Sequence, residues 1–131
     1  MKSFRFDMWQ SGRKILLKDL IDSFGISKDL TWILWNFSGS GDTPHGENME
    51  SFEKKIRNLP NGYKLDKNDF FKFTNGLTDI TSIKLTGVLA GRPVIEISGV
   101  DSTYWQISID IEGATKPQHL PSFEKGTEGN S

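Results

Sequence analysis

The first residues of the chain alternate between apolar and polar types, and this alternation predicts a strand. Phe4, Phe6 and Met8 occupy every second position, with Arg5 and Asp7 between them. Successive side chains of a strand point to opposite faces of a sheet. The pattern therefore indicates a strand that buries one face and leaves the other in solvent.

Two later segments place apolar residues at helical spacing. Residues 14–24 and residues 47–59 each carry a stripe whose members recur three or four positions apart, as on one face of an amphipathic helix. The stripes consist of Leu17, Leu20, Ile21 and Phe24 in the first segment, and of Met49, Phe52, Ile56 and Leu59 in the second. Gly25 suits the position after the first helix, and the turn residues 60–62 end the second.

The segment between the two helices predicts a buried strand and then a loop. Residues 31–38, TWILWNFS, are bulky and apolar at both alternating sets of positions, which is typical of a central strand covered on both faces. Trp32 and Trp35 would then point to opposite faces, and both would be buried. The glycine-rich string GSGDTPHG at 39–46 follows, and we expect it to form the loop that leads into the second helix.

Most of the second half of the chain predicts β structure. Three runs rich in β-branched and aromatic residues fill positions 80–111, separated by turn residues at 90–93 and 99–102. Short connections of this kind join antiparallel neighbours, so we expect a three-stranded meander. Residues 66–76 leave two alternatives open, because the run is too short for its periodicity to decide. It forms either a short helix capped by Asp66 or an extended segment.

These elements together predict an α+β fold. We expect a mostly antiparallel sheet with the C-terminal three-stranded meander, packed against two or three helices. Residues 1–111 would form a single domain. Residues 112–131 combine proline, glycine, serine and charged residues with few bulky apolar ones, and we expect a flexible or loosely docked tail.

Composition excludes several classes of protein. The 131 residues include no cysteine, which rules out disulfides, thiolate metal sites and thiol nucleophiles. Sixteen basic and 17 acidic residues give a net charge of -1, without the concentrated basic face of most nucleic-acid binders. The chain shows no signal-peptide pattern and no apolar stretch long enough to span a membrane. We therefore expect a cytoplasmic protein that binds neither nucleic acid directly nor a membrane.

The loop at 39–46 resembles a phosphate-binding loop only in part. It lacks the lysine that follows the glycines in a P-loop, and Pro44 stands where the dinucleotide-binding motif has its third glycine. Asp42 also adds negative charge where an anionic ligand would bind. We favour a strand-to-helix connector in which Asp42 or Thr43 caps the second helix.

No set of residues has the spacing of a catalytic or metal site. Asp42, His45 and Glu47 are close in sequence, but they match no zinc motif. Ser102 lies in GVDST, which lacks the glycines of a nucleophile elbow. We therefore expect no catalytic residues, no metal and no cofactor.

Two loops hold the candidate contacts for a protein partner. The first is an acidic strip at 42–53, where carboxylates could meet a basic partner, although a solvated helix face would look the same. The second is the turn at 101–105, where an aromatic residue beside an acidic one could anchor an interface. Only one of the adjacent Tyr104 and Trp105 can face the core. The candidate residues are Asp42, His45, Glu47, Glu50, Glu53, Asp101, Tyr104 and Trp105.

Two strings give the chain a family resemblance. WNFSGSGD at 35–42 and PVIEISGVDSTYWQI at 93–107 resemble segments of the small immunity proteins that bacteria make against polymorphic or contact-dependent inhibition toxins. The resemblance implies a cytoplasmic, non-catalytic inhibitor that binds its cognate toxin. Such a toxin is often a nuclease, and its basic groove would meet Asp42, Glu47, Glu50 or Asp101.

The sequence thus favours a protein-binding inhibitor of the immunity type over two alternatives. One alternative is a small-ligand or enzymatic domain that uses the loop at 39–47. The other is an adaptor subunit of a larger assembly.

Overall fold

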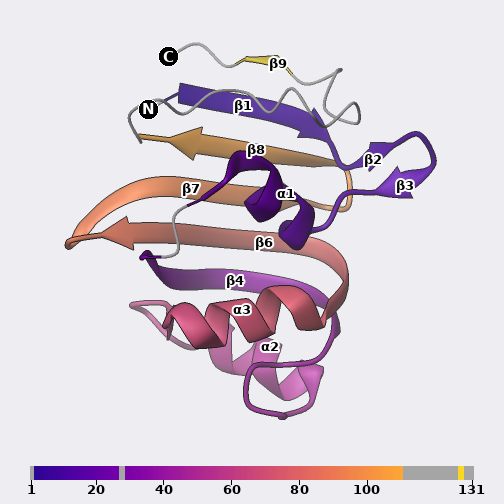
Figure 1. The fold of residues 1–131 in the computed structure, drawn as a ribbon. Helices are drawn as coiled ribbons and strands as arrows, with labels where there is room; N and C mark the ends of the chain where they lie inside the picture. Colours follow the sequence, from indigo (N-terminus) through magenta and orange to yellow (C-terminus); the bar gives the residue numbers. More distant parts are fainter. Residues whose placement is uncertain (1, 27–28, 111–126, 129–131) are drawn as a thin grey trace.

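The computed structural model describes residues 2–26, 29–110 and 127–128, and these form one antiparallel sheet covered by helices (Figure 1). The strand order in the sheet is β5-β4-β6-β7-β8-β1-β9. A separate two-stranded hairpin, β2–β3, follows β1. The strands are β1 (Lys2–Asp7), β2 (Trp9–Gln10), β3 (Arg13–Lys14), β4 (Thr31–Gly41), β5 (Tyr63–Leu65), β6 (Leu77–Leu89), β7 (Arg92–Val100), β8 (Tyr104–Ile109) and β9 (Thr127–Glu128).

Three helices lie on one face of this sheet (Figure 1). They are α1 (Leu17–Phe24), α2 (Met49–Arg57) and α3 (Lys67–Gly76). Ring contacts show that all three meet the same face, because Phe24 of α1 packs on Phe4, Phe52 of α2 on Phe37, and Phe70 of α3 on Trp32. The predicted α+β fold with its C-terminal meander is confirmed, and the described residues form three helices.

Capping residues explain where the helices begin. The side chain of Asn48 accepts a hydrogen bond from the Ser51 amide at 2.8 Å, and Asp66 accepts one from the Asp69 amide at 2.8 Å. Asn48, and neither Asp42 nor Thr43, therefore caps α2. The cap at Asp66 settles the choice left open for residues 66–76, which form a helix.

The opposite face of the sheet is open across much of the described chain, and this corrects the prediction for residues 31–38. Trp32 is buried, but Trp35 is 37% exposed and donates from Nε1 to Thr86 Oγ1 at 2.9 Å. β4 lies between the short strand β5 and β6, next to the edge of the sheet. The face of β4 that carries Trp35 thus lies outside the main core.

The glycines at 39–41 also differ from the prediction. They belong to β4 and pair with the start of β6, where Gly39 lies opposite Ile80 and Gly41 opposite Leu77. Irregular register near Gly39 and Gly41 bends the strand. The connecting loop is therefore confined to residues 42–48, and the glycine backbone is not arranged to cradle an anion.

Only two residues of the expected tail are described. Thr127 and Glu128 form β9, which pairs with Arg5 and Phe4 of β1. The rest of the predicted tail, 112–126 and 129–131, lies outside the described residues. No helix in the described part of the chain is long and apolar enough to cross a bilayer.

Candidate functional site

Three connections meet at one end of the sheet, which we call the hairpin end (Figure 1). The loop at 42–48 leaves β4 opposite the first residue of β6, and the Asp42 amide donates to the Gly76 carbonyl at 2.8 Å. The β7–β8 turn at 101–103 contacts the same strand, because the Ser102 amide donates to the Thr81 carbonyl at 2.8 Å. The β2–β3 hairpin follows β1 there. The two loops that the sequence predicts as partner contacts thus lie at the same end of the fold.

Lys14 ties these connections together. Its side chain is only 11% exposed, and its Nζ donates to Asp79 Oδ1 at 2.6 Å and to Ser102 Oγ at 3.0 Å. The same ammonium lies 5.5 Å from the centroid of the Trp9 ring. Lys14 therefore fixes the hairpin and the β7–β8 turn against the start of β6.

The Lys14 hydrogen bond holds the pKa of Asp79 below its ordinary value of 3.8, and the bond from the Ile80 amide acts in the same direction against the effect of burial. Asp79 is thus a carboxylate at neutral pH. An ammonium that donates to this carboxylate has no free lone pair to accept the Ser102 proton. The arrangement fits a structural tie and does not fit a Ser–Lys nucleophile.

The β7–β8 turn is held in a strained conformation. Asp101 and Ser102 have φ angles of 46° and 57°, a region that non-glycine residues rarely adopt. The hydrogen bonds of Ser102 hold this geometry, and a further one runs from the Asp101 amide to Ser82 Oγ at 3.2 Å. A strained conformation of this kind persists where several contacts together hold the backbone in place, and it is often found at functional sites.

Trp9 is the exposed aromatic residue of the hairpin end. It is 55% exposed, and its indole Nε1–H donates to the Ser102 carbonyl at 3.1 Å. The hydrogen bond and the Lys14 ammonium hold the ring in one orientation at the surface. A large ring ordered in this way can bury its apolar area in a partner at a low entropic cost.

Exposed carboxylates lie at the same end of the sheet as Trp9. Asp7 and Asp101 are exposed, and so is Asp42 on the neighbouring loop. Of the cations near this end, Lys14 pairs with Asp79 and Arg13 with Asp19 at 2.8 Å, while the Arg5 guanidinium lies over the Tyr104 ring. The surface of the hairpin end therefore combines an ordered tryptophan with an excess of negative charge.

The residues of the 42–48 loop are held mainly by the helices. His45 Nε2 lies 3.5 Å from Asp69 Oδ2 of α3. Glu47 precedes α2 and lies 3.5 Å from Lys55 Nζ, while its Oε1 is buried without a partner. Burial raises the pKa of the adjacent Tyr63 phenol above 10.0, although Lys55 acts in the opposite direction. Within the described residues, no group of three His, Asp or Glu could hold a metal ion.

The remaining predicted contacts divide between surface and core. Glu50 is exposed and Glu53 is half-buried on α2. Tyr104 is half-buried under the Arg5 guanidinium, 4.5 Å from its ring centroid. Trp105 is completely buried, and its Nε1 donates to the Ile15 carbonyl at 2.8 Å. Because Trp105 is buried, it is no longer a candidate contact. Tyr104 faces the other side of the sheet, since successive residues of a strand point to opposite faces.

Sequence reasoning missed Trp9, Lys14 and Asp79. Lys14 is separated by 65 positions from Asp79 and by 88 from Ser102, so no local pattern connects them. The weak signal for Trp9 was its place at the end of an alternating strand, just before turn residues.

Comparison of the chain with models of protein families, with curated proteins and with solved structures finds no match. The candidate site is therefore defined by its geometry alone.

Replacement of Asp79 by asparagine tests the tie at Lys14. We expect the variant to lose stability above pH 4, because the buried ammonium loses its ionised partner. The pKa of Asp79 is lower in the folded protein than in the unfolded chain. Ionised Asp79 therefore stabilises the fold at pH values above its unfolded-state pKa, and this stabilisation is lost as the pH falls through its folded-state pKa. The difference in urea unfolding free energy between the wild type and Asp79→Asn should therefore shrink below pH 4.

A matched control is Asp110→Asn. Asp110 lies 3.3 Å from Arg92, and both side chains are more than half exposed, so we expect a small and salt-sensitive effect. Equal losses in the two variants, or a difference for Asp79→Asn that does not change with pH, would contradict the assigned role.

Proposed function

We propose that this protein binds another protein through its hairpin end, and that it acts as a non-catalytic inhibitor of the immunity type. The observation that carries the proposal is Trp9, which is held by Ser102 with more than half of its surface exposed. Tryptophan is among the residues most enriched at the energetic centres of protein interfaces. The proposal also places the protein in the cytoplasm.

The charge of the hairpin end supports a basic partner. Exposed Asp7, Asp42 and Asp101 lie at this end, and their carboxylates make no ion pair within the described residues. A nuclease that binds the phosphate backbone has a groove lined by lysine and arginine, which would complement these carboxylates. We therefore propose a nuclease-type toxin as the cognate partner.

The two strings that resemble immunity proteins also lead to this end. Residues 35–42 run through the last part of β4 into the 42–48 loop, and residues 93–107 form the β7–β8 hairpin. The second string contains Ser102, whose carbonyl accepts a hydrogen bond from Trp9, and the first string ends at the 42–48 loop at the same end of the sheet.

Affinity capture with matched tryptophan variants tests the proposal. The full chain is used as bait in a lysate of its native host that co-expresses the product of the neighbouring gene. We expect a stoichiometric partner with the wild type, and binding weakened by about thirtyfold or more for Trp9→Ala, as for a central interface residue. Trp35→Ala is the control, since Trp35 is also exposed but lies on the open sheet face.

Two outcomes would contradict the proposal. Recovery of no stoichiometric partner would overturn it, as would equal affinity of the Trp9→Ala and Trp35→Ala variants for the purified partner. The inhibitor role is tested separately by the partner's nuclease activity in the complex. Full activity in the complex would favour the adaptor alternative.

A further inference from the structure

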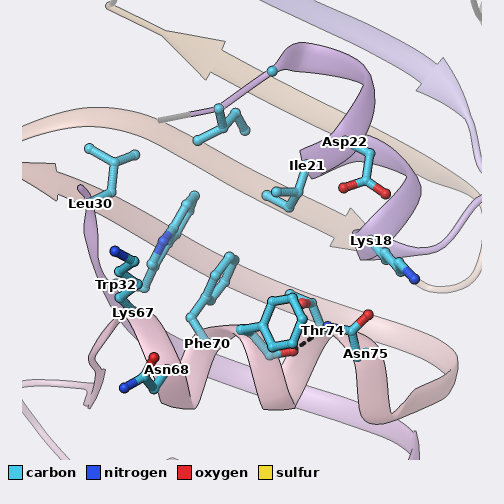
Figure 2. Close-up of a pocket in the computed structure, with 13 residues that line it drawn as sticks. Lys18, Ile21, Asp22, Leu30, Trp32, Lys67, Asn68, Phe70, Thr74 and Asn75 are labelled. Atoms are coloured by element: carbon cyan, nitrogen blue, oxygen red, sulfur yellow. Dashed lines mark hydrogen bonds between the residues drawn. The ribbon is translucent and has the colours of Figure 1, made fainter. Parts of the chain in front are cut away.

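A cleft of about 540 Å³ lies between α1 and α3 (Figure 2). Its volume falls within the range of small-molecule binding sites. Trp32 and Phe70 form part of its lining and stack face to face, with ring centroids 4.1 Å apart. Leu30 and Ile21 add aliphatic surface, and Phe71 of α3 is 68% exposed beside them. The cleft thus offers an apolar site that includes an unusually exposed aromatic ring.

Trp32 supplies a hydrogen-bond donor inside this apolar lining. The residue is 3% exposed, yet its indole Nε1–H makes no hydrogen bond within the described part of the chain. The other three tryptophans each donate, Trp9 to Ser102, Trp35 to Thr86 and Trp105 to Ile15. Among the described residues, the fully buried side-chain polar atom without a partner is Glu47 Oε1, so the Trp32 N–H is open to the cleft and available to a bound molecule. An acceptor on such a molecule would satisfy this N–H.

The charges around the cleft favour an anion. Lys18 and Asp22 lie one turn apart on α1, so their charges offset each other. Lys67, the first residue of α3, lines the cleft together with Trp32 (Figure 2), and its ammonium forms no ion pair with any described residue. The donor of Trp32 and the unpaired charge of Lys67 thus both belong to the lining of the cleft.

We propose that the cleft binds a small carboxylate with an apolar body. The body lies against the Trp32–Phe70 pair and the Phe71 ring. The carboxylate accepts a hydrogen bond from Trp32 Nε1–H and pairs with Lys67. The site is independent of the proposed protein interface, since it shares no residue with the hairpin end.

Indole signals in a ¹H–¹⁵N correlation spectrum of the full chain provide the test, with decanoate as the probe. The chain has four tryptophans, and loss of one signal in Trp32→Phe assigns the signal of Trp32. We expect decanoate to shift the Trp32 indole signal in a saturable manner and to leave the other three indole signals in place. Decanol, which has the same chain without the charge, should bind about tenfold more weakly, because it lacks the charge-assisted bonds.

Variants of exposed residues locate the site without threatening the fold. We expect Lys67→Gln and Phe71→Ala each to weaken decanoate binding by about tenfold. Lys84→Gln changes an exposed lysine on the open face of the sheet, and its affinity should equal that of the wild type. Trp9→Ala should also bind decanoate normally, which separates this proposal from that of the protein interface.

The proposal is overturned if decanoate produces no saturable shift, or if all four indole signals move together. Equal affinities for decanoate and decanol, or for Lys67→Gln and Lys84→Gln, would contradict the assigned carboxylate contact.

Discussion

Truncation of Trp105 to alanine is expected to lower the free energy of unfolding by about 3–5 kcal/mol, the range for a large aromatic residue removed from a core. Trp105 is completely buried in β8. A Cβ atom added at Gly99 on the neighbouring strand would lie 2.9 Å from its ring, so the indole fills the space that this glycine leaves. Urea unfolding followed by circular dichroism measures the loss without depending on tryptophan fluorescence.

Two further variants separate packing from hydrogen bonding at this position. Trp105→Phe keeps a ring in the core but leaves the Ile15 carbonyl without the indole donor, and we expect a loss of about 1–3 kcal/mol. Trp35→Ala removes a tryptophan that is 37% exposed and should cost much less. Equal losses for Trp105→Ala and Trp35→Ala would show that Trp105 does not hold the core together.

The strands predicted from the sequence are those in which one face is buried and the other meets solvent. Phe4 and Phe6 alternate with polar residues and are buried, as are Trp105, Ile107 and Ile109 at the other end of the chain. A register shift by one residue would expose every apolar side chain of such a strand. Alternation therefore predicted both the strand and its buried face.

Prediction was wrong where side chains carry no periodic signal. Trp35 continues the apolar run of 31–38, but a register shift beside it and the position of β4 next to the edge of the sheet leave it exposed. Gly39 and Gly41 have no side chain to alternate, so their place in a strand depends on β6, which lies far along the chain. The two-residue strands of the β2–β3 hairpin are too short for any period.

The site was predictable only as a set of separate loops. The sequence indicated candidate contacts at 42–53 and at 101–105, and the structure brings the 42–48 loop and the 101–103 turn of these ranges to the hairpin end. Their link through Lys14 and Asp79 arises from strand pairing, because β6 carries Asp79 between the two loops. Long-range pairing of this kind cannot be inferred from local spacing in one sequence.

Gly41→Ala is expected to be the most damaging change at the base of the 42–48 loop. Gly41 has a φ of 131°, which side-chain-bearing residues rarely adopt, and an added Cβ would collide with the Gly76 carbonyl oxygen and approach Leu77 Cα to 2.7 Å. Backbone atoms cannot rotate away as a flexible side chain can. Strain and overpacking together should cost about 3 kcal/mol or more in urea unfolding.

Gly46→Ala is the matched control within the same loop. Gly46 also has a positive φ, 78°, but an added Cβ would meet no atom within 4 Å, so only the backbone conformation is penalised, by about 1–2 kcal/mol. Gly41→Ala should therefore be clearly less stable than Gly46→Ala, and equal stabilities would contradict the close approach of β4 to the end of α3. Because Gly41 directs the chain into Asp42, whose amide donates to the Gly76 carbonyl, Gly41→Ala should also displace the Asp42 carboxylate. The proposed interface would then lose affinity in Gly41→Ala and keep it in Gly46→Ala.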